Sequence, residues 1–532
     1  MITFCISIVL LILGYWLYSK LIERMLGVDP SCKTPAVAHP DGVDYVPMKP
    51  WRVFLIQFLN IAGVGPIIGA VMGAQFGTAS FLWIVFGCIL AGAVHDFIAG
   101  FISIRHDGAS LPEIHGKYLG NGMKQFMRGF TVVLMILVGV VFVKTPATLL
   151  TGQPFVPMKT VEVAVQPTEA NTVVAAEAAT EAAAEAAEPT VEIQKVPLFS
   201  PNVLLYFWII VIFAYYLLAT LLPIDKVIGK IYPIFGILLL AMAVAIMVAF
   251  FVHGVDLPEV WEKLSNQHPN AKSTPIFPMM FISIACGAIS GFHATQSPLM
   301  ARCMTNERQA RPIFYGAMIA EGIVALIWAA AAAYFFYGGD DSLYHGETDA
   351  DMVKLIANTW FPTVIAFITL LGVVAAAVTS GDTALRSARL IVADFMHVDQ
   401  KPVHKRLYVA LPIFAITAGL LVFAVANKEG FGVIWRYFSW ANQVLATVTL
   451  WACTVFLIQH RPGKAWYWIT LVPALFMTMV TSCFIFVAEK EGLGSLLPRT
   501  VGYVLGGVVT AAVTVMFFLY AARQKKNNAN MQ

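Results

Sequence analysis

Residues 62–70 read AGVGPIIGA and lie in the middle of an apolar segment that is long enough to cross a lipid bilayer. Proline lacks an amide hydrogen and clashes with the preceding helical turn, and glycine is a poor helix former. An unsatisfied backbone group costs several kcal/mol in hydrocarbon, so such an interruption survives only where it faces protein or a water-filled cavity. The run therefore predicts a broken membrane helix whose freed backbone groups line a cavity.

The composition of the chain supports a membrane environment. Of its 532 residues, 59% are hydrophobic and 12% are charged, whereas soluble domains contain about 25% charged residues. A net charge of +3 gives no indication of a nucleic-acid partner. The seven cysteines are scattered and show neither a disulfide framework nor a zinc-binding spacing. We expect an all-α polytopic membrane protein without a metal or a cofactor.

Apolar segments set the predicted topology, because a membrane helix requires about 20 apolar residues. The first segment lacks the basic start of a signal peptide and is predicted to be a retained helix, and the long ninth segment is open to division into two. Thirteen segments qualify: 2–22, 51–75, 79–104, 126–147, 201–222, 228–253, 276–303, 312–337, 359–390, 405–426, 431–459, 465–488 and 498–521.

The distribution of basic residues predicts the orientation, because Lys and Arg favour the cytoplasmic side. With the N-terminus outside and the C-terminus inside, most of the 34 Lys and Arg residues fall on or beside inside loops. The acidic stretches GGDDSLYHGETDAD and NKEG then fall outside. Twelve helices would place the basic tail or the basic first loop outside, so thirteen are favoured.

Residues 152–198 differ in composition from the rest of the chain. They contain the Ala/Glu-rich stretch AAEAATEAAAEAAEP, which has no apolar face for packing. Segments of this kind cannot bury enough apolar surface to fold alone. We interpret residues 152–198 as a solvated external linker, with a partner-binding tether as the alternative.

A second interruption lies five helices after the first, where the seventh segment contains Gly287, Gly291 and Pro298. Since five is an odd number, the two broken helices cross the bilayer in opposite directions. Paired broken helices in two such units are typical of inverted-repeat transporters with a midplane site, whereas either interruption alone would favour close packing of small residues. The implied organisation is an extra N-terminal helix and cytoplasmic loop, two inverted repeats, and two C-terminal helices with a basic tail: 1–50, 51–253, 254–459 and 460–532.

Two groups of residues are predicted to form the site. Freed backbone groups and half-helix N-termini suit an anionic part of a substrate, so the predicted substrate-binding residues lie at the two interruptions: Gly63, Gly65, Pro66, Gly287, Ser290, Gly291 and His293. Polar and ionisable side chains at membrane depth mark ion pathways, so the predicted ion-coupling residues are His95, Asp96, Glu321, Thr379, Ser380 and Asp382.

The ionisable residues also have structural alternatives. His293 carries a coupled proton or binds a carboxylate, or else it bonds a carbonyl that the break frees. His95 and Asp96 form a proton relay or a hydrogen bond between helices. Glu321 is a proton carrier or a neutral packing group.

Three further patterns predict local contacts. Asp382 and Arg386 stand at the i,i+4 spacing of a neutralising pair. Ser110 and Glu113, in the inside loop RHDGASLPEIH, have the spacing of a capping box. Two amides before the first break and two in the motif ANQ of the eleventh segment are interpreted as hydrogen-bonding groups between helices: Gln57, Asn60, Asn442 and Gln443.

Several longer motifs make the chain similar to a known family. They are DPSCKTPAVAHPDGVDYVP, AGVGPIIGA with AQFG, LAGAVHDF, RHDGASLPE, IACGAISGFHA, DTALRSARL and ANQVLA, and they run in order from about residue 28 to 450. These motifs resemble the carbon starvation protein A family. One departure is TQSPLMAR after SGFHA, where longer members have a turn rich in Ser, Gly and Thr.

The resemblance implies a branch of the amino acid–polyamine–organocation superfamily and a LeuT-like five-plus-five inverted repeat with broken second and seventh helices. It also implies an inner-membrane transporter of peptides, or of pyruvate with proton symport, that is used when carbon is scarce. By the same analogy the ninth helix faces the first broken helix, so that Thr379 and Ser380 with carbonyls freed at Gly63 to Pro66 form a small cation site.

The predicted function is secondary active transport of pyruvate or short peptides, and no enzymatic activity is expected. No nucleotide-binding loop appears in the sequence, so an ion gradient is expected to supply the energy. Proton symport is favoured over a sodium-coupled amino acid or peptide transporter. A sensor lacks an output domain in the sequence, and an intramembrane hydrolase lacks HExxH and GxSxG motifs; the hydrolase would use His95, Asp96, His106, Glu113 and His115. The substrate, the ion and the oligomeric state stay open.

Overall fold

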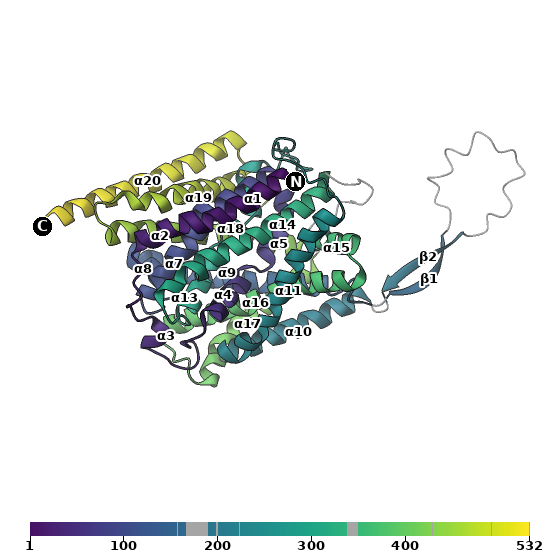
Figure 1. The fold of residues 1–532 in the computed structure, drawn as a ribbon, viewed down its shortest axis with the longest axis horizontal. Coiled ribbons are helices and arrows are strands. Elements are labelled where there is room, and N and C mark those ends of the chain that lie inside the picture. Colours follow the sequence, from purple (N-terminus) through teal and green to yellow (C-terminus); the bar gives the residue numbers. More distant parts are fainter. Residues whose placement is uncertain are drawn as a thin grey trace, which may run out of the picture.

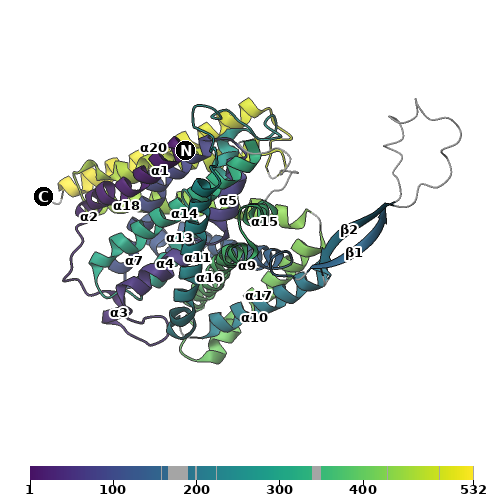
Figure 2. The same cartoon turned by 45° about the vertical axis from the view of Figure 1, so that its right-hand side comes forward.

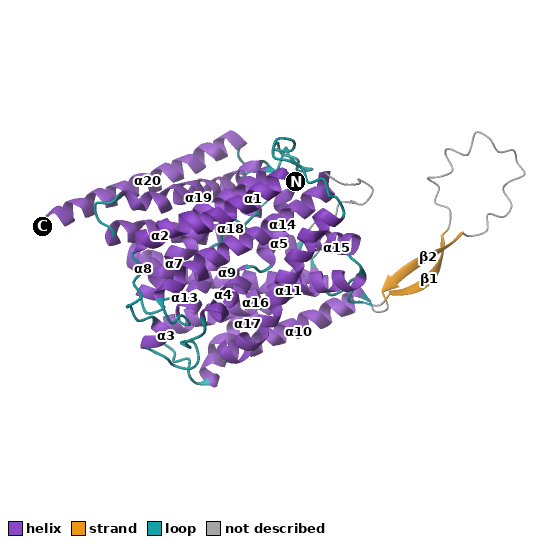
Figure 3. Ribbon diagram, viewed as in Figure 1, coloured by secondary structure: helices purple, strands orange, loops and turns teal. Residues whose placement is uncertain are grey.

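The computed structural model describes residues 1–156, 158–165, 190–197, 200–222, 224–337, 349–427, 429–490 and 492–530. Apart from one two-stranded hairpin, the regular structure in these ranges is helical (Figure 3). The helices are long, apolar and roughly aligned, so the protein is a multi-pass membrane protein.

Eleven helices in the described ranges are long and apolar enough to cross a membrane. Their bounds are Ile2–Leu26 (α1, Ile2–Leu13, to α2, Ser19–Leu26), Ala79–Arg105 (ending in α7, Ala93–Arg105), Asn121–Leu149 (α9), Pro201–Leu221 (α10), Tyr232–Val252 (within α11, Ile224–Val252), Glu307–Tyr337 (ending in α14, Ala317–Tyr337), Thr363–Met396 (α16), Val403–Ala426 (α17), Gly430–His460 (α18), Ala465–Val487 (ending in α19, Trp468–Val487) and Arg499–Lys526 (within α20, Arg499–Asn530).

A further span is bent at the predicted position. α4 (Pro50–Ile61) and α5 (Val64–Ala74) meet at 44°, with Ala62 and Gly63 between them in non-helical conformations. Gly65 and Pro66 lie in the first turn of α5, where the missing amide hydrogen of proline removes no helical hydrogen bond. The glycine and proline residues therefore start the second half-helix.

The seventh predicted segment is broken over a longer stretch. Residues Ile276–Met280 and α12 (Phe281–Ser283) end at Ile284, whose ψ is 61°, and α13 (Gly291–Ala301) begins after Ser290. Gly287 lies within the break and Gly291 is the first residue of α13. The prediction that Pro298 interrupts the span is wrong: it lies inside α13, because proline is tolerated in membrane helices packed among other helices.

Two other expectations need correction. The ninth segment is not divided into two spans: apart from its first few residues it belongs to one continuous helix, α16, and the short helix α15 (Asp349–Trp360) precedes it across Phe361 and Pro362. The linker is not wholly irregular, because β1 (Met158–Val165) and β2 (Thr190–Pro197) form an antiparallel hairpin; the sequences MKTVEVAV and TVEIQKVP have the alternation of a strand. The Ala/Glu-rich stretch between them lies outside the described residues.

The broken helices occupy the middle of the bundle. In both views α19 and α20 lie on one flank and α10 and α17 on the opposite flank, with α7, α13 and α14 between them (Figures 1 and 2). Burial agrees: 78% of the apolar window in Glu307–Tyr337 and 83% in Gly430–His460 is buried, against 11% in Arg499–Lys526. Five consecutive alanines of α14, Ala329–Ala333, are fully buried, and such small side chains let α5 pack closely against this helix.

Candidate functional site

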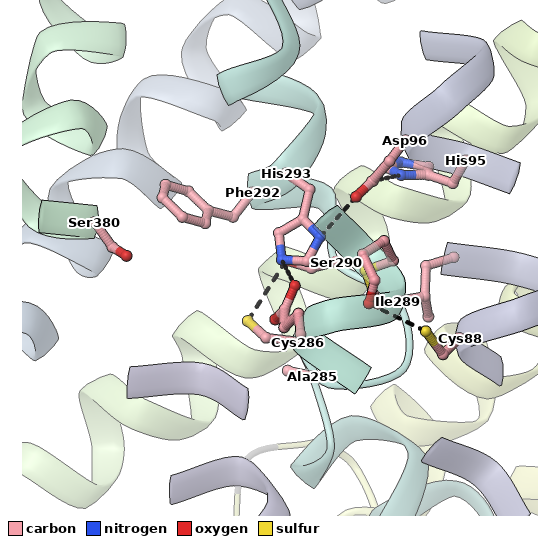
Figure 4. A network of polar contacts seen from close by, with 12 residues as sticks. Cys88, His95, Asp96, Ala285, Cys286, Ile289, Ser290, Phe292, His293 and Ser380 are labelled. Carbon is pink, nitrogen blue, oxygen red and sulfur yellow. Dashed lines mark hydrogen bonds and ion pairs between the residues drawn. The ribbon is translucent and has the colours of Figure 1, made fainter. Parts of the chain in front are cut away.

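A cluster of ionisable side chains lies just after the second break. The imidazole of His293, on α13, places Nδ1 3.0 Å from Oδ2 of Asp96 on α7 and Nε2 3.3 Å from Oε2 of Glu321 on α14. His95 Nδ1 lies 2.7 Å from the other carboxylate oxygen, Oδ1 of Asp96. All four side chains are fully buried. Figure 4 shows the His293 ring pointing toward Asp96, with the thiol of Cys286 on its other side.

The geometry of this cluster suits a shared proton. An imidazole with a carboxylate oxygen near each ring nitrogen donates to both only when both nitrogens carry a proton. Neither oxygen of Glu321 has a hydrogen-bond partner of good geometry among the described residues, so its contact with His293 is a charge contact. The cluster thus connects α7, α13 and α14 through buried ionisable side chains.

Two amides of α18 hold the second break in place. Asn442 Oδ1 accepts hydrogen bonds from the Ser290 hydroxyl at 3.1 Å and from the Phe292 amide at 2.7 Å. Gln443 Nε2 donates to the carbonyls of Ala285, at 2.7 Å, and Ile289, at 3.1 Å. The prediction that these amides hydrogen-bond between helices is therefore confirmed. The backbone groups freed by the break and the start of α13 are largely satisfied by the protein itself.

The first break is held by hydroxyl groups. Thr379 and Ser380 of α16 donate to the carbonyl of Leu59 at 3.2 and 3.1 Å. The residue before α5, Gly63, makes no side-chain cap, so the first amides of α5 have no such partner. A Cβ at Gly63 would lie 2.5 Å from the Ser380 oxygen, which shows how closely α16 covers this break.

The two breaks touch each other. A Cβ at Gly65 would lie 2.3 Å from Cys286 Sγ, and one at Gly69 would lie 2.8 Å from the carbonyl oxygen of Ser283. A Cβ at Gly287 would lie 2.5 Å from that of Ala325. The glycines are therefore required for close packing, and the same packing brings the start of α5 to the residues beside His293.

Gln57 and Asn60, in the last turns of α4, behave differently from the amides of α18. Both side chains are fully buried, and their oxygen and nitrogen atoms have no hydrogen-bond partner in the part of the chain that the structure describes. The interpretation of this pair as interhelical hydrogen-bonding groups is therefore wrong. Since α4 packs against α13, two unpaired amides lie on the helix that leads to the first break.

Asp382 stands apart from the other predicted ion-coupling residues. Its carboxylate accepts hydrogen bonds from Tyr215 and Tyr232, each at 2.8 Å, from α10 and α11. Arg386 is not its salt-bridge partner: Nη1 of Arg386 lies 3.6 Å from Asp44 and Nη2 donates to backbone carbonyls of Ala219 and Leu222. The predicted i,i+4 pair is wrong because each group finds partners on neighbouring helices.

The residues of the hydrolase alternative have separate partners. Glu113 binds Lys124 and Arg128, His106 Nε2 lies 2.9 Å from the Tyr118 hydroxyl, and His115 Nε2 lies 3.1 Å from the Thr449 hydroxyl. Burial lowers the pKa of His115 to about 3, so it is neutral. The capping box is also wrong, because the Ser110 side chain makes no cap hydrogen bond and Glu113 turns to the two basic residues. Among the described residues no group of three or more His, Cys, Asp and Glu side chains is placed to hold a metal.

Cavities lie on both sides of the second break and differ in size. One of about 310 Å³ lies at the end of the bundle where α5 ends, between Gln75, Ser283 and Ser439. The other, of about 20 Å³, lies between α13 and α16, beside Thr295, Ser387 and Arg302, and has room for about one water molecule. The two cavities that flank the second break therefore differ in volume by about tenfold or more.

Comparison with known proteins agrees with this architecture. The sequence matches the family described as carbon starvation protein CstA over residues 1–343 and 338–483. It is 27% identical to a peptide transporter CstA of Campylobacter jejuni, over 96% of this chain and 82% of that protein. It is 31% identical to the pyruvate/proton symporter BtsT of Escherichia coli K12, over 60% of this chain and 47% of that protein. An uncharacterized membrane protein of Haemophilus influenzae is 43% identical over 61% of this chain and 88% of its own length.

Solved structures share the fold without close sequence similarity. A manganese transporter of Eremococcus coleocola aligns with a TM-score of 0.52 and 9% identity, covering 91% of this chain and 99% of that one. At this identity the likeness concerns the arrangement of helices alone.

Proposed function

The chain belongs to the carbon starvation protein CstA family, and on that premise we propose that it is a secondary active transporter that imports pyruvate or short peptides together with protons. The names of its relatives supply these two substrate classes. The observation that carries the proposal is the buried contact of His293 with Asp96 and Glu321 beside the two breaks. Buried ionisable groups at membrane depth are the usual elements of proton relays.

We propose that the proton cluster, formed by His293, Asp96 and Glu321, couples protonation to helix movement. His293 follows the start of α13, while its two carboxylate partners lie on α7 and α14. Loss of a proton from the imidazole leaves two carboxylates and one donor, so contacts between these helices weaken. Any shift of α13 relative to α7 and α14 then depends on whether the proton is bound.

The first break is proposed to bind the anionic end of the substrate. The first amides of α5 have no side-chain cap, and the positive end of a helix dipole favours a carboxylate. Gln57 and Asn60 supply further unpaired donors on α4. Pyruvate and the C-terminus of a peptide share the carboxylate that this arrangement would recognise, with Gly63, Gly65, Pro66, Gly287, Ser290 and Gly291 shaping the space.

Proton coupling is preferred to sodium coupling because of the contacts of the α16 hydroxyls. The hydroxyl oxygens of Thr379 and Ser380 lie within hydrogen-bond distance of the Leu59 carbonyl on α4 and of carbonyls of their own helix. Each hydroxyl has one proton to donate, so protein carbonyls already accept it. Asp382 is enclosed by two tyrosine hydroxyls. We assign coupling to His293, Asp96 and Glu321, with His95 as the group that orients Asp96.

The proposed topology is a LeuT-like pair of inverted repeats, 51–253 and 254–459, in the inner membrane with the N-terminus outside. In this orientation the larger cavity faces outward and the smaller one faces the cytoplasm.

The test is uptake of labelled pyruvate and of a labelled dipeptide into proteoliposomes. Each substrate is given with an inward proton gradient, with an inward sodium gradient and with neither. We expect proton-driven uptake of one substrate, loss of that uptake to background in His293→Ala, and normal uptake in His404→Ala, which removes an exposed histidine of α17.

Three results would contradict parts of the proposal. Normal proton-driven uptake by folded His293→Ala would remove the cluster from the mechanism. Uptake driven by sodium alone would move coupling to Thr379 and Ser380. No uptake of either substrate by folded protein would show that this chain shares the fold of the family but transports neither pyruvate nor the dipeptide.

A further inference from the structure

Four arginines meet in the interior of the bundle, and one of them, Arg302, lines the smaller cavity. Arg302 directly follows α13, Arg386 and Arg389 lie in the last three turns of α16, and Arg406 lies in the first turn of α17. All four are at least nine-tenths buried, and the charges of the other three act on Arg389. Burial of several like charges is costly unless anions compensate them.

The described residues place too few carboxylates beside these charges. Asp44, in the loop before α4, is the buried acid of the cluster, and its Oδ1 lies 3.6 Å from Arg386 Nη1 and 3.6 Å from Arg389 Nη2. Both distances exceed that of a hydrogen bond. Asp394, at the surface, is the other acid that acts on Arg302. Two carboxylates against four guanidinium groups leave about two positive charges.

Each of three guanidinium groups makes at least one hydrogen bond, but some of its N–H donors have no hydrogen-bond acceptor among the described residues. Arg389 Nη1 donates to Gln400 Oε1 at 2.7 Å, Arg406 Nη2 to the carbonyl of Lys401 at 3.4 Å, and Arg386 Nη2 to the carbonyls of α10. Other buried donors have no hydrogen-bond partner among the described residues: Nε and Nη1 of Arg386, Nε and Nη2 of Arg389, and Nε and Nη1 of Arg406. Oδ1 of Asp44 is likewise without a hydrogen bond.

The position of Asp44 is fixed by the backbone around it. The amides of Val46 and Met48 donate to the carbonyls of Arg302 and Cys303 at 3.1 and 3.0 Å. The ring of Tyr45 packs against the Arg302 guanidinium at 5.0 Å. The loop therefore lies across the arginines and carries one carboxylate to them without completing their hydrogen bonds.

We propose that Arg386, Arg389 and Arg406, with Arg302 at the edge and Asp44 as an internal counter-charge, form a binding site for a phosphate group. Phosphate carries about −1.5 to −2 charges at neutral pH, which matches the excess of positive charge. It also offers several acceptor oxygens to guanidinium forks, which bind phosphate through two parallel hydrogen bonds. A single carboxylate would leave both charge and donors unmatched.

The site is separate from the proton cluster, and the inference does not rest on transport. Its phosphate group belongs either to inorganic phosphate in solution or to the headgroup of an anionic lipid, and both present the same oxygens to the arginines. Asp44 competes with that group for the positive charge, because its carboxylate lies 3.6 Å from the guanidinium groups of both Arg386 and Arg389.

The experiment measures binding to the purified full-length protein. Inorganic phosphate is titrated at constant ionic strength by calorimetry, and binding of phosphatidylglycerol is compared with that of phosphatidylcholine in nanodiscs. Asp44→Asn keeps all four arginines and removes the competitor, so affinity should rise about threefold or more. Asp107→Asn, which removes a side chain that is 83% exposed, should leave affinity unchanged. Arg389→Gln should weaken binding about tenfold.

The outcomes are distinct. Saturable phosphate binding that is tightened by Asp44→Asn supports a soluble ligand. Binding of phosphatidylglycerol but not of free phosphate, with the same response to Asp44→Asn, supports the lipid headgroup. No binding of either by folded protein, or equal binding by the wild type, Asp44→Asn and Asp107→Asn, would overturn the proposal. Since Asp44→Asn retains every arginine, the test does not depend on whether Arg389→Gln folds.

Discussion

The two broken helices differ in how the backbone groups freed by the break find hydrogen-bond partners. The second break, residues 284–290, is wide, and Asn442 and Gln443 satisfy its backbone and cap the start of α13. The first break is two residues long; hydroxyls hold one carbonyl of α4, and the start of α5 has no side-chain cap. The hydrogen bonds from α18 fix the second break and hence the position of His293. At the first break, the uncapped start of α5 and the unpaired amides of α4 are free to bind a ligand under the proposed function.

The largest effect is expected where the second break meets backbone. A Cβ at Gly291 would lie 2.5 Å from both the Ala446 amide nitrogen and the Asn442 carbonyl oxygen, and neither can move without shifting α18. Gly291→Ala should lower the free energy of unfolding by about 3 kcal/mol and abolish uptake. Thermal unfolding of the purified protein in detergent measures the loss.

Gly65→Ala is the matched change at the first break, because its Cβ would meet the side chain of Cys286. Combining Gly65→Ala with Cys286→Ala should restore part of the stability, since the obstacle is a side chain. An equal loss in the single and double variants would show that the first break is as rigid as the second.

The clamp itself gives the next prediction. Asn442→Ala leaves the buried Phe292 amide and Ser290 hydroxyl without their acceptor, and an unsatisfied buried group costs about 1–3 kcal/mol. We expect a loss of about 2 kcal/mol in unfolding free energy. Unchanged unfolding would mean that the wide break does not need the amide of α18.

Asn60→Ala should show the reverse pattern. The removed amide has no hydrogen-bond partner among the described residues, so unfolding should change by less than about 1 kcal/mol. Uptake should fall about tenfold, which corresponds to about 1.4 kcal/mol of lost binding. A variant with normal uptake would place the substrate away from the end of α4.

The smallest effect is expected from Ser380→Ala. Its hydroxyl shares the Leu59 carbonyl with Thr379, so one donor stays and the loss should be about 1 kcal/mol or less. Proton-driven uptake should persist, because we assign no coupling ion to this residue. Uptake that loses its response to an ion gradient would instead make the first break the coupling site.

Much of this arrangement is readable from residue types. Glycine and proline in apolar segments locate both breaks, because few other residues interrupt a membrane helix. Charged groups in apolar helices identify His293, Asp96 and Glu321, because such groups are too costly to lie there without partners. Local chemistry is sufficient for these predictions.

Partner choice is not readable from local sequence. Asn60 and Asn442 are the same residue type beside equivalent interruptions, yet Asn442 makes several hydrogen bonds and Asn60 makes none among the described residues. The difference depends on which helix packs against each break. The helix that contacts the second break, α18, lies about 150 residues further along the chain, so local sequence does not reveal the contact. For the same reason Asp382 does not form an ion pair with Arg386: tyrosine hydroxyls from α10 and α11 donate to its carboxylate instead.

The length of α16 has a consequence for the depth at which its residues lie. Its 34 residues span about 50 Å at 1.5 Å per residue, whereas the hydrocarbon core is about 30 Å thick. The end near Thr363 carries exposed apolar side chains from the first turn, Val364, Phe367 and Ile368, so that end already lies in lipid. The excess must emerge at the other end or be taken up by tilt. If it emerges, the arginine-bearing turns extend to headgroup level, where water and phosphate are plentiful, and if the helix tilts at the first break, its length carries that movement to the same turns.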